Sequence, residues 1–507
     1  MNFKFLSRLL ATSVVTIVAV LILSVVNFNS VAAYESVSEK EPNDSIKTAE
    51  KTVPDTVYTG RAPSGDIDYY KIELKSSGYL KITEVDKGGS FDFDLLDSEG
   101  NSYNFSLDAI FYGRHMRMGT YYLSVSPLLF PDNSEYGFYY TFEDAGETFP
   151  DTGADDIALG ANKIKLNNTY KGQIAFSEES DFYKFDLQSA GKLTVKLYSS
   201  DSVKISFGNY YNFDQHGETY HSQCLEKGTY YLQISCGNDA TYSFSITLEP
   251  VRLEQGSMMV VCGDRAEISI LNADYNLLKH STKYESSDSS IASVDADGKV
   301  TGRKAGPATV YVTVGGTTLK CSVQVLYKDV VNTKEYWFEP TNYLTNEEVV
   351  KGYDGQTMFR PNNQCTRAQM VTFLWRLKGC PKPQISSTKF KDVKKSAYYY
   401  KAVLWAVEKG ITTGYSKTKF KPNNVCTRAQ TVTFLWRMAG KPKATTTKNK
   451  FRDIDNTDYF YNAVLWASEK KIVEGYKNKT FRPQNKCTRR QMVTFLYKYD
   501  KYVNGRG

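Results

Sequence analysis

Three arginines recur in one local pattern in the last third of the sequence. Arg367, Arg428 and Arg489 each follow a threonine and stand two positions before a glutamine. A guanidinium is a planar fork that can hold a carboxylate through two parallel hydrogen bonds. In the first turn of a helix its charge opposes the helix dipole, so the recurrence needs a local reason. The pattern predicts either a clamp on a ligand carboxylate or a pair with an acidic side chain inside the protein.

A second group of candidate ligands lies near the start of the chain. The oxygen-bearing residues of this group are Glu39, Glu41, Asn43, Asp44, Asp66 and Asp68. Calcium takes six to eight oxygen ligands, which carboxylates and an amide can supply. We therefore treat these six residues as a candidate calcium site, and no other cofactor is predicted. The alternative is an acidic, solvated linker.

Motifs of common catalytic sites are missing from the sequence. It contains no His-Glu-x-x-His, no Gly-x-Ser-x-Gly and no glycine-rich phosphate loop, and it has four histidines. We predict no catalytic residues and no enzyme activity. The alternative is a surface hydrolase, a peptidase or glycosidase, with an unrecognised active site in residues 34–250.

The arginines belong to a segment that repeats three times. Cys365, Cys426 and Cys487 are 61 residues apart, and each precedes the threonine of a Thr-x-x-Gln capping box. Helices are therefore predicted to begin at these threonines, with the cysteines as packing residues. Further helices are predicted over 398–409 and 459–470. In the first copy Pro340 falls inside the matching helix, which we expect to be broken or shifted.

The start of the sequence and the distribution of its charges limit the classes of partner that the protein can bind. Residues 1–33 combine Lys4 and Arg8 with an apolar run and a Val-Ala-Ala end, which predicts a cleaved signal peptide; the alternative is a retained anchor. Residues 351–507 carry 33 lysines and arginines against 9 acidic residues, whereas the rest of the chain carries 30 against 47. This asymmetry indicates a polyanion partner at one end only, or a solvated lysine-rich face. For an exported chain the charge alone predicts a wall or membrane polymer rather than nucleic acid. Of these we expect the wall polymer, with no membrane contact after signal cleavage.

Residues 34–326 show short alternating runs between turn residues, which predicts β-structure. Two stretches repeat: the one beginning at Asp68 returns at Asp181, and the one beginning at Gly119 returns at Gly228. The repeated unit is about 110 residues long, which suits one β-sandwich. In the second copy Asp151, Asp155 and Asp156 are spaced differently from the first cluster, so no equivalent calcium site is predicted there.

The C-terminal repeats resemble the S-layer homology domain. The match rests on Phe390-Lys-Asp392-Val393, Gly414-Tyr415, Phe420-Lys-Pro422 and the Thr-Arg-Ala pattern, and it covers residues 327–498. The resemblance implies a pseudo-threefold helical prism that binds pyruvylated secondary cell-wall polysaccharide, with Arg367, Arg428 and Arg489 contacting the ligand. Gln replaces the Glu that often ends the motif, which preserves capping but not a negative charge.

Two further resemblances concern the β-region. The repeated pair is similar to the bacterial pre-peptidase C-terminal domain, which is related to the collagen-binding domain of clostridial collagenases, and the first acidic cluster is similar to the calcium pattern of that relative. Residues 284–312 resemble bacterial Ig-like group 2 domains. Cys262 and Cys321 lie near the ends of this last domain and are either bridged or free.

The sequence thus predicts an all-β region of two jelly-roll-like sandwiches and one Ig-like sandwich, followed by an all-α triple repeat. The expected boundaries are 1–33 for the signal, 34–146, 147–250 and 251–326 for the three sandwiches, and 327–380, 381–443 and 444–507 for the repeats. We expect a wall-anchored surface protein whose sandwiches act as spacers or bind an extracellular glycan or protein.

Overall fold

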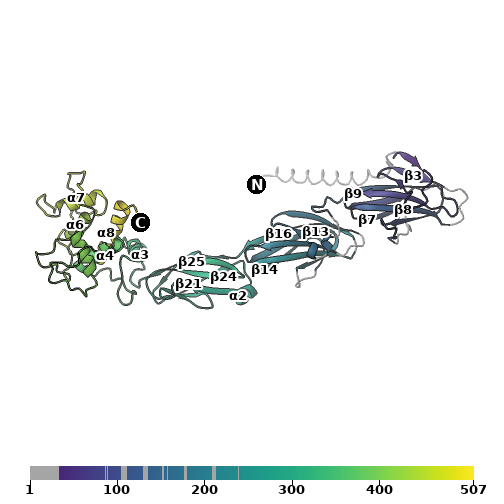
Figure 1. Cartoon of the computed structure of the whole chain (residues 1–507). Helices are drawn as coiled ribbons and strands as arrows, with labels where there is room; N and C mark the ends of the chain where they lie inside the picture. Colours follow the sequence, from purple (N-terminus) through teal and green to yellow (C-terminus); the bar gives the residue numbers. More distant parts are fainter. Residues whose placement is uncertain are drawn as a thin grey trace, which may run out of the picture. The chain divides into compact units, whose positions relative to one another are not determined.

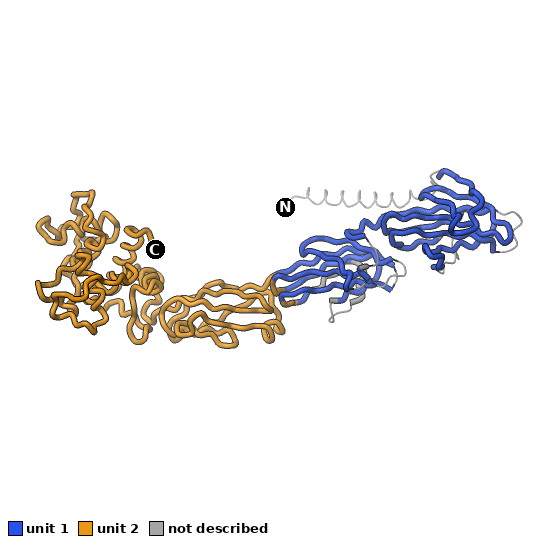
Figure 2. The backbone as a smooth tube through the Cα atoms, in the orientation of Figure 1, with its two compact units in different colours: residues 1–188, 192–223, 227–249 blue, residues 189–191, 224–226, 250–507 orange. Residues whose placement is uncertain are grey.

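The computed structural model describes residues 34–506, except 86, 88, 104–110, 129–134, 151–153, 157, 176–179, 208–212 and 238. The predicted signal peptide lies outside these residues. The chain forms two compact units, which Figure 2 shows in different colours. The first unit contains residues 1–188, 192–223 and 227–249, and the second contains 189–191, 224–226 and 250–507.

The first half of unit one is a two-sheet structure (Figure 1). Its strands are β1 Ser36–Ser38, β2 Glu50–Lys51, β3 Val57–Gly60, β4 Asp68–Leu74, β5 Gly78–Glu84, β6 Phe91–Leu96, β7 Phe111–Met116, β8 Gly119–Pro127 and β9 Tyr136–Asp144. They form sheets of order β1-β3-β9-β5-β7 and β2-β4-β8-β6. Alternate residues of β4 are buried, as the period-two pattern requires, and they join one aromatic-rich core.

The second half of unit one is similar, but its longer strands form a single sheet. Its elements are the 3-10 turns Ala154–Asp156 and Ala158–Gly160, and the strands β10 Asn162–Lys163, β11 Thr169–Ile174, β12 Ser180–Leu187, β13 Gly191–Phe207, β14 Phe213–Leu225, β15 Gly228–Cys236 and β16 Ala240–Pro250. The sheet order is β10-β12-β15-β13-β16-β11, and β14 pairs with β13. Strand β12 pairs with β15 as β4 pairs with β8, so the two repeated sequence stretches are neighbouring antiparallel strands in both copies.

Unit two begins with an Ig-like sandwich. Its elements are β17 Arg252–Leu253, β18 Ser257–Val261, β19 Arg265–Glu267, β20 Ile270–Leu271, α2 Tyr275–His280, β21 Thr282–Ser286, β22 Ala292–Val294, β23 Lys299–Gly302, β24 Gly306–Val314 and β25 Thr317–Leu326. The main sheets have the orders β18-β25-β24-β21 and β19-β23-β22. Cys262 and Cys321 are buried and unbridged.

The rest of unit two is helical. The helices are α3 Phe338–Asn346, α4 Arg367–Leu377, α5 Tyr400–Glu408, α6 Arg428–Met438, α7 Tyr461–Glu469 and α8 Arg489–Val503. Capping boxes are present at Thr366 and Thr427, as predicted. At Thr488 the backbone N–H donates to Gln491 Oε1 at 3.2 Å, whereas the threonine hydroxyl makes no hydrogen bond with the described residues. A β-rich region followed by a helical one confirms the predicted fold class.

The prediction for Pro340 is wrong. Helix α3 is unbroken and as long as α5 and α7, and Pro340 is its third residue, at the place that Ala402 takes in α5. The first four N–H groups of a helix have no partner within it, so proline in the first turn removes no helical hydrogen bond.

The three repeats contact one another in cyclic order. Cys426 N–H donates to the Cys365 carbonyl, Cys487 N–H to that of Cys426, and Cys365 N–H to that of Cys487, each at 2.9 Å. The helix pairs follow the same order, since α4 packs on α5, α6 on α7 and α8 on α3. The third repeat therefore closes on the first.

The burial of these cysteines leads to a testable prediction. Burial raises the pKa of Cys426 to about 12 and that of Cys487 to about 11, so almost no reactive thiolate exists at neutral pH. Mass spectrometry after brief thiol alkylation of the native protein should show exposed Cys380 modified first, and Cys365, Cys426 and Cys487 only after denaturant is added. A Cys380→Ser variant should lose the fastest phase and keep only the slower labelling of the half-buried Cys224 and Cys236. Fast labelling of a ring cysteine would contradict the closed ring.

Candidate functional site

The three recurring arginines lie at the junctions between repeats. Each is buried, with 4%, 5% and 1% of Arg367, Arg428 and Arg489 exposed. Each Nε–H donates to the carbonyl of a phenylalanine in the next repeat around the ring. These bonds are Arg367 to Phe420 at 2.9 Å, Arg428 to Phe481 at 2.9 Å and Arg489 to Phe359 at 2.8 Å. The arginines therefore help to join the repeats, a role that sequence reasoning did not find.

Aromatic rings hold each guanidinium in place. The Arg428 guanidinium carbon lies 4.8 Å from the centre of the Phe481 ring, 5.2 Å from that of Phe495 and 5.1 Å from that of Tyr476. Burial lowers the pKa of all three arginines, and the electron-rich ring faces compensate part of the lost hydration. The orientation of each guanidinium is thus set before any ligand arrives.

The outer nitrogens of two arginines are left without partners. Within the described part of the chain, the Nη groups of Arg367 and Arg428 make no hydrogen bond, and none of the three arginines pairs with a carboxylate. Arg489 differs, because its Nη2 donates to the Lys351 carbonyl at 2.9 Å. The partner inside the protein is thus a carbonyl rather than an acidic side chain, and two arginines keep both Nη groups for another acceptor.

An aspartate in each repeat supports the same junction. Asp392 accepts hydrogen bonds from the backbone of Phe420 at 2.8 Å and of Lys421 at 2.7 Å. The corresponding acceptors in the other repeats are Asp329 and Asp453. Lys421 has a positive φ of 59°, which a lysine adopts only when its surroundings require it. The Phe-x-Asp motif therefore holds the Phe-x-Pro turn. The aspartate recurs in every copy, although Tyr327 replaces the phenylalanine in the first.

Exposed tyrosines lie near these junctions. Tyr336, Tyr398 and Tyr459 occupy equivalent places in the repeats and are 56%, 63% and 62% exposed. Partial burial raises the pKa of Tyr459, while the positive charges of Arg437 and Arg367 partly offset the rise, which places this phenol near arginines of the first two repeats. An exposed ring beside a cation is the kind of surface that stacks on a sugar and holds its acidic substituent.

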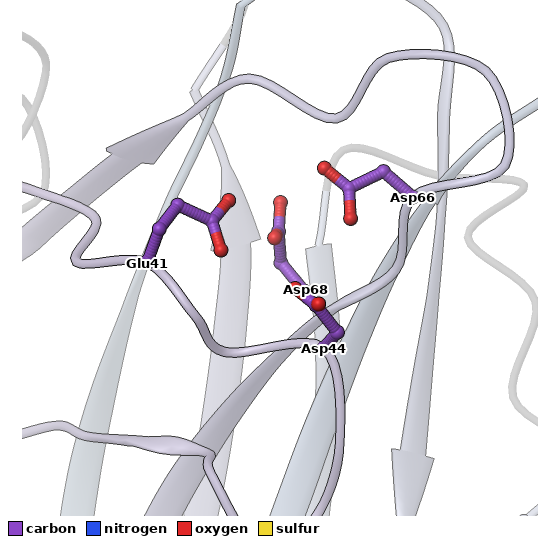
Figure 3. A group of neighbouring side chains, drawn as sticks. All are labelled: Glu41, Asp44, Asp66 and Asp68. Carbon is purple, nitrogen blue, oxygen red and sulfur yellow. The ribbon is translucent and has the colours of Figure 1, made fainter.

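The first sandwich gathers four of the six candidate calcium ligands. The carboxylate oxygens of Glu41, Asp44, Asp66 and Asp68 lie within 4.8 Å of one another. Figure 3 shows the carboxylates of Glu41 and Asp66 pointing from opposite sides toward that of Asp68. The buried side-chain amide of Asn43 lies 3.0 Å from Glu41 Oε2 and 2.8 Å from Asp68 Oδ1. These five residues therefore form one oxygen-rich cluster.

Glu39 has another role. Its Oε1 accepts from the Arg61 backbone N–H at 2.8 Å, and its Oε2 accepts from the Tyr136 hydroxyl at 2.8 Å. The Tyr136 hydroxyl also bonds to Asp68 at 2.6 Å. Glu39 therefore supports the cluster through Tyr136 and lies outside the four-carboxylate group.

The cluster has the donor set that calcium prefers. Burial raises the pKa of Asp68 to about 7, and the negative charges of Glu39, Asp66 and Glu41 add to this effect. Carboxylates crowded in this way repel one another unless a cation lies among them. The Asn43 amide nitrogen donates to Glu41 and Asp68, so the candidate ligands are the carboxylate oxygens, which fit calcium and no soft metal.

The second sandwich also gathers acidic groups. Asp155, Asp156 and Asp181 place carboxylate oxygens within 4.8 Å of one another, which their spacing in the sequence did not indicate. Arg117 of the first sandwich donates through Nη2 to both oxygens of Asp156 at 2.8 Å, and Asn162 donates to Asp155 at 2.6 Å. A guanidinium thus supplies positive charge here. Asp151 lies outside the described residues, and the absence of calcium in this copy stays a prediction.

Two known domain families match the chain. Residues 326–371, 389–432 and 450–493 match the S-layer homology domain, and residues 266–335 match the bacterial Ig-like domain (group 2). The helical part of the chain thus consists of three S-layer homology repeats, and the sandwich before it is a bacterial Ig-like domain.

The curated relatives include several surface proteins. The chain is 30% identical over 154 residues to a cellulosome-anchoring protein of Acetivibrio thermocellus, which covers 29% of this chain and 34% of the relative. It is 31% identical over 102 residues to a surface layer protein of Brevibacillus choshinensis, covering 19% and 9%. It is 28% identical over 174 residues to an amylopullulanase of Thermoanaerobacterium thermosulfurigenes, covering 32% and 9%. The chain therefore spans about a third or less of the length of these relatives.

Among solved structures, the pre-peptidase C-terminal domain of a collagenase from Bacillus anthracis matches 17% of this chain and 94% of its own length, at 22% identity and a TM-score of 0.16. In the described residues no helix has the length and apolar character needed to cross a membrane. The S-layer homology repeats and the similarity to cell wall and surface layer proteins identify the chain as a cell-wall or cell-surface protein.

Proposed function

We propose that the three S-layer homology repeats hold this protein non-covalently on an anionic, pyruvylated secondary cell-wall polysaccharide. The observation that carries the proposal is that Arg367 and Arg428 have fixed orientations but unused hydrogen-bond donors. Each has its Nε bonded to a carbonyl and its ring contacts made, while its Nη groups have no partner among the described residues. A pyruvyl carboxylate can take these two donors.

The chemistry of such a site follows from its parts. A guanidinium that is already oriented loses little conformational entropy when it binds, and two parallel charge-assisted bonds select a planar carboxylate over a point charge. The excess of 33 basic over 9 acidic residues in 351–507 attracts a polyanion over a longer range. Arg489 has one Nη group already bonded to Lys351, so this arginine alone should hold a carboxylate less firmly than Arg367 or Arg428 does.

The domains ahead of the repeats serve, in this proposal, as spacers or as binding modules for an extracellular glycan or protein. Calcium in the first sandwich would order the loops that carry Glu41 and Asp66 and would take no part in a reaction. We infer that the protein is not an enzyme. Relatives named as an amylopullulanase and an endoglucanase share only 9% and 12% of their own length with this chain.

A sedimentation experiment tests the anchoring. The chain from residue 34 onward should sediment with isolated wall sacculi, and it should stay in the supernatant when the sacculi have been stripped of pyruvylated polymer. Bare peptidoglycan serves as the control surface. Binding should weaken as salt is raised, because the contacts are ionic. Equal sedimentation with intact and stripped sacculi would show that the polymer is not the ligand.

A further inference from the structure

One arginine breaks the symmetry of the three repeats. Arg490 is the second residue of α8, where the first and second repeats have Ala368 and Ala429. Its side chain lines a pocket of about 500 Å³ between the third and first repeats, together with Trp337 and Asn363 of the first repeat. This cationic side chain therefore distinguishes one junction from the other two.

The guanidinium of Arg490 has no protein partner in the described part of the chain. Its Nε is buried and makes no hydrogen bond, and no ion pair involves this residue. Buried donors in folded proteins are almost always bonded to protein, water or an ion, so this N–H is available to an acceptor that comes from outside the protein. In the same region the backbone N–H of Arg490 is bonded to the Pro361 carbonyl at 3.0 Å, which fixes the start of the side chain at the pocket wall.

The other charged groups that line the pocket are already engaged. Asp329 accepts from the backbone of Phe359 at 2.8 Å and of Arg360 at 2.6 Å, and Glu335 accepts from Trp337 Nε1 at 3.1 Å. The Arg360 side chain donates to both oxygens of Asp354, at 3.0 and 2.8 Å. The donors to Asp329 and Glu335 are neutral, so both acids keep their negative charge, and Arg490 is the charged side chain of this pocket that makes no hydrogen bond in the described part of the chain.

A shared neighbour connects this pocket to the arginine of the second repeat. Burial raises the pKa of exposed Tyr336, and the positive charges of Arg490 and Arg428 partly offset that rise, so both guanidiniums lie near this phenol. The positive charges of both arginines therefore act on the same exposed ring. The pocket also offers amide donors from Asn362 and Asn363.

We propose that Arg490 makes the pocket between the third and first repeats a second oxyanion site, which binds a carboxylate or phosphate group of the wall polymer and is missing at the two junctions that have alanine. This proposal rests on the proposed anchoring function for the identity of its ligand. The binding chemistry itself is a charge-assisted hydrogen bond from the guanidinium to an oxygen of the anion.

Two measurements on the chain from residue 34 onward test the proposal. In the first, the protein is labelled with ¹⁵N-arginine, and the Nε–H signal that disappears in Arg490→Ala is followed while sodium acetate or sodium phosphate replaces sodium chloride at constant ionic strength. We expect this signal to shift with at least one of the two anions. A signal that moves with neither anion overturns the proposal.

The second measurement compares affinities for wall sacculi. Arg490→Ala, which restores the residue of the other repeats, should bind about tenfold more weakly, as expected for one charge-assisted contact. Arg452→Ala removes an exposed arginine of the same repeat and should stay close to the wild type. Wild-type affinity of Arg490→Ala overturns the proposal while leaving the anchoring function in place.

The two sources of the anion can be separated with the Arg490 signal itself. If the signal shifts with acetate and not with phosphate, the bound group is the pyruvyl carboxylate, and if it shifts with phosphate alone, the group is a phosphate of the polymer. Failure of the wild type to bind any sacculi would defeat the anchoring function. In that case the response of the Arg490 signal to acetate and phosphate would still decide whether the oxyanion site exists.

Discussion

An Arg428→Ala variant should lose both stability and wall binding. The substitution removes a hydrogen bond to the buried Phe481 carbonyl and leaves a cavity between aromatic rings, which together should cost about 3 kcal/mol in the free energy of unfolding. Arg428→Lys should also be destabilised, because lysine keeps the charge but cannot reproduce the planar contact. Urea unfolding followed by tryptophan fluorescence measures the loss selectively, since all five tryptophans lie between residues 337 and 466.

A matched control separates charge from structure in this experiment. Lys470→Ala removes an exposed positive charge from the third repeat and should unfold at nearly the wild-type urea concentration. If Arg428→Ala unfolded like the wild type and lost only its affinity for sacculi, the arginine would be a ligand contact alone, and its bond to Phe481 would contribute nothing measurable.

Calcium should stabilise the first sandwich by an amount comparable to the loss of stability expected for Arg428→Ala. A ligand that binds only the folded state, at a concentration a thousand times its dissociation constant, adds about 4 kcal/mol to the free energy of unfolding. Hydrogen-exchange mass spectrometry should show slower exchange of peptides from residues 36–74 in calcium than in a chelator. Differential scanning calorimetry should show the matching rise of one transition.

The variants for the calcium experiment leave the buried hydrogen bonds intact. Asp44→Asn and Asp66→Asn each remove a carboxylate of the cluster and spare the bond between Asp68 and Tyr136, so both should reduce the calcium effect. Asp297→Asn neutralises an exposed acid of the Ig-like domain and should leave the effect unchanged. An identical response to calcium and magnesium, or no response at all, would show that the cluster is an ordinary acidic surface.

Local signals in the sequence predicted much of the fold. The capping boxes at Thr366 and Thr427 depend on residues three positions apart, so their geometry is encoded within one helical turn. The β-strands followed from the alternation of buried and exposed residues. Pro340 misled the prediction because an alignment with Ala402 placed it inside a helix without showing that both belong to the first turn.

The roles of the site residues were harder to predict. The bond from Arg489 to Phe359 joins residues 130 positions apart, and nothing in either segment indicates which repeat receives which arginine. The spacing of the repeats predicted that the three arginines have related roles. It could not predict that each Nε bonds to a carbonyl while Nη donors stay unused, because this depends on how the repeats pack against one another. In the acidic cluster, the residue types alone also could not show that Glu39 bonds to Arg61 and Tyr136 and lies outside the group of four carboxylates.

The cyclic order of the repeats has a mechanical consequence. Tyr343 of α3 donates to Asp500 of α8 at 2.8 Å, and Tyr497 of α8 donates to Glu339 of α3 at 2.6 Å, so the first repeat is clasped by the last. The Ig-like domain enters this ring at the first repeat, where Ala305 N–H donates to the Gln356 carbonyl at 2.9 Å. A pulling force transmitted through the β-domains would therefore act on a closed ring of three repeats. In an open row, the same force would separate the repeats one after another.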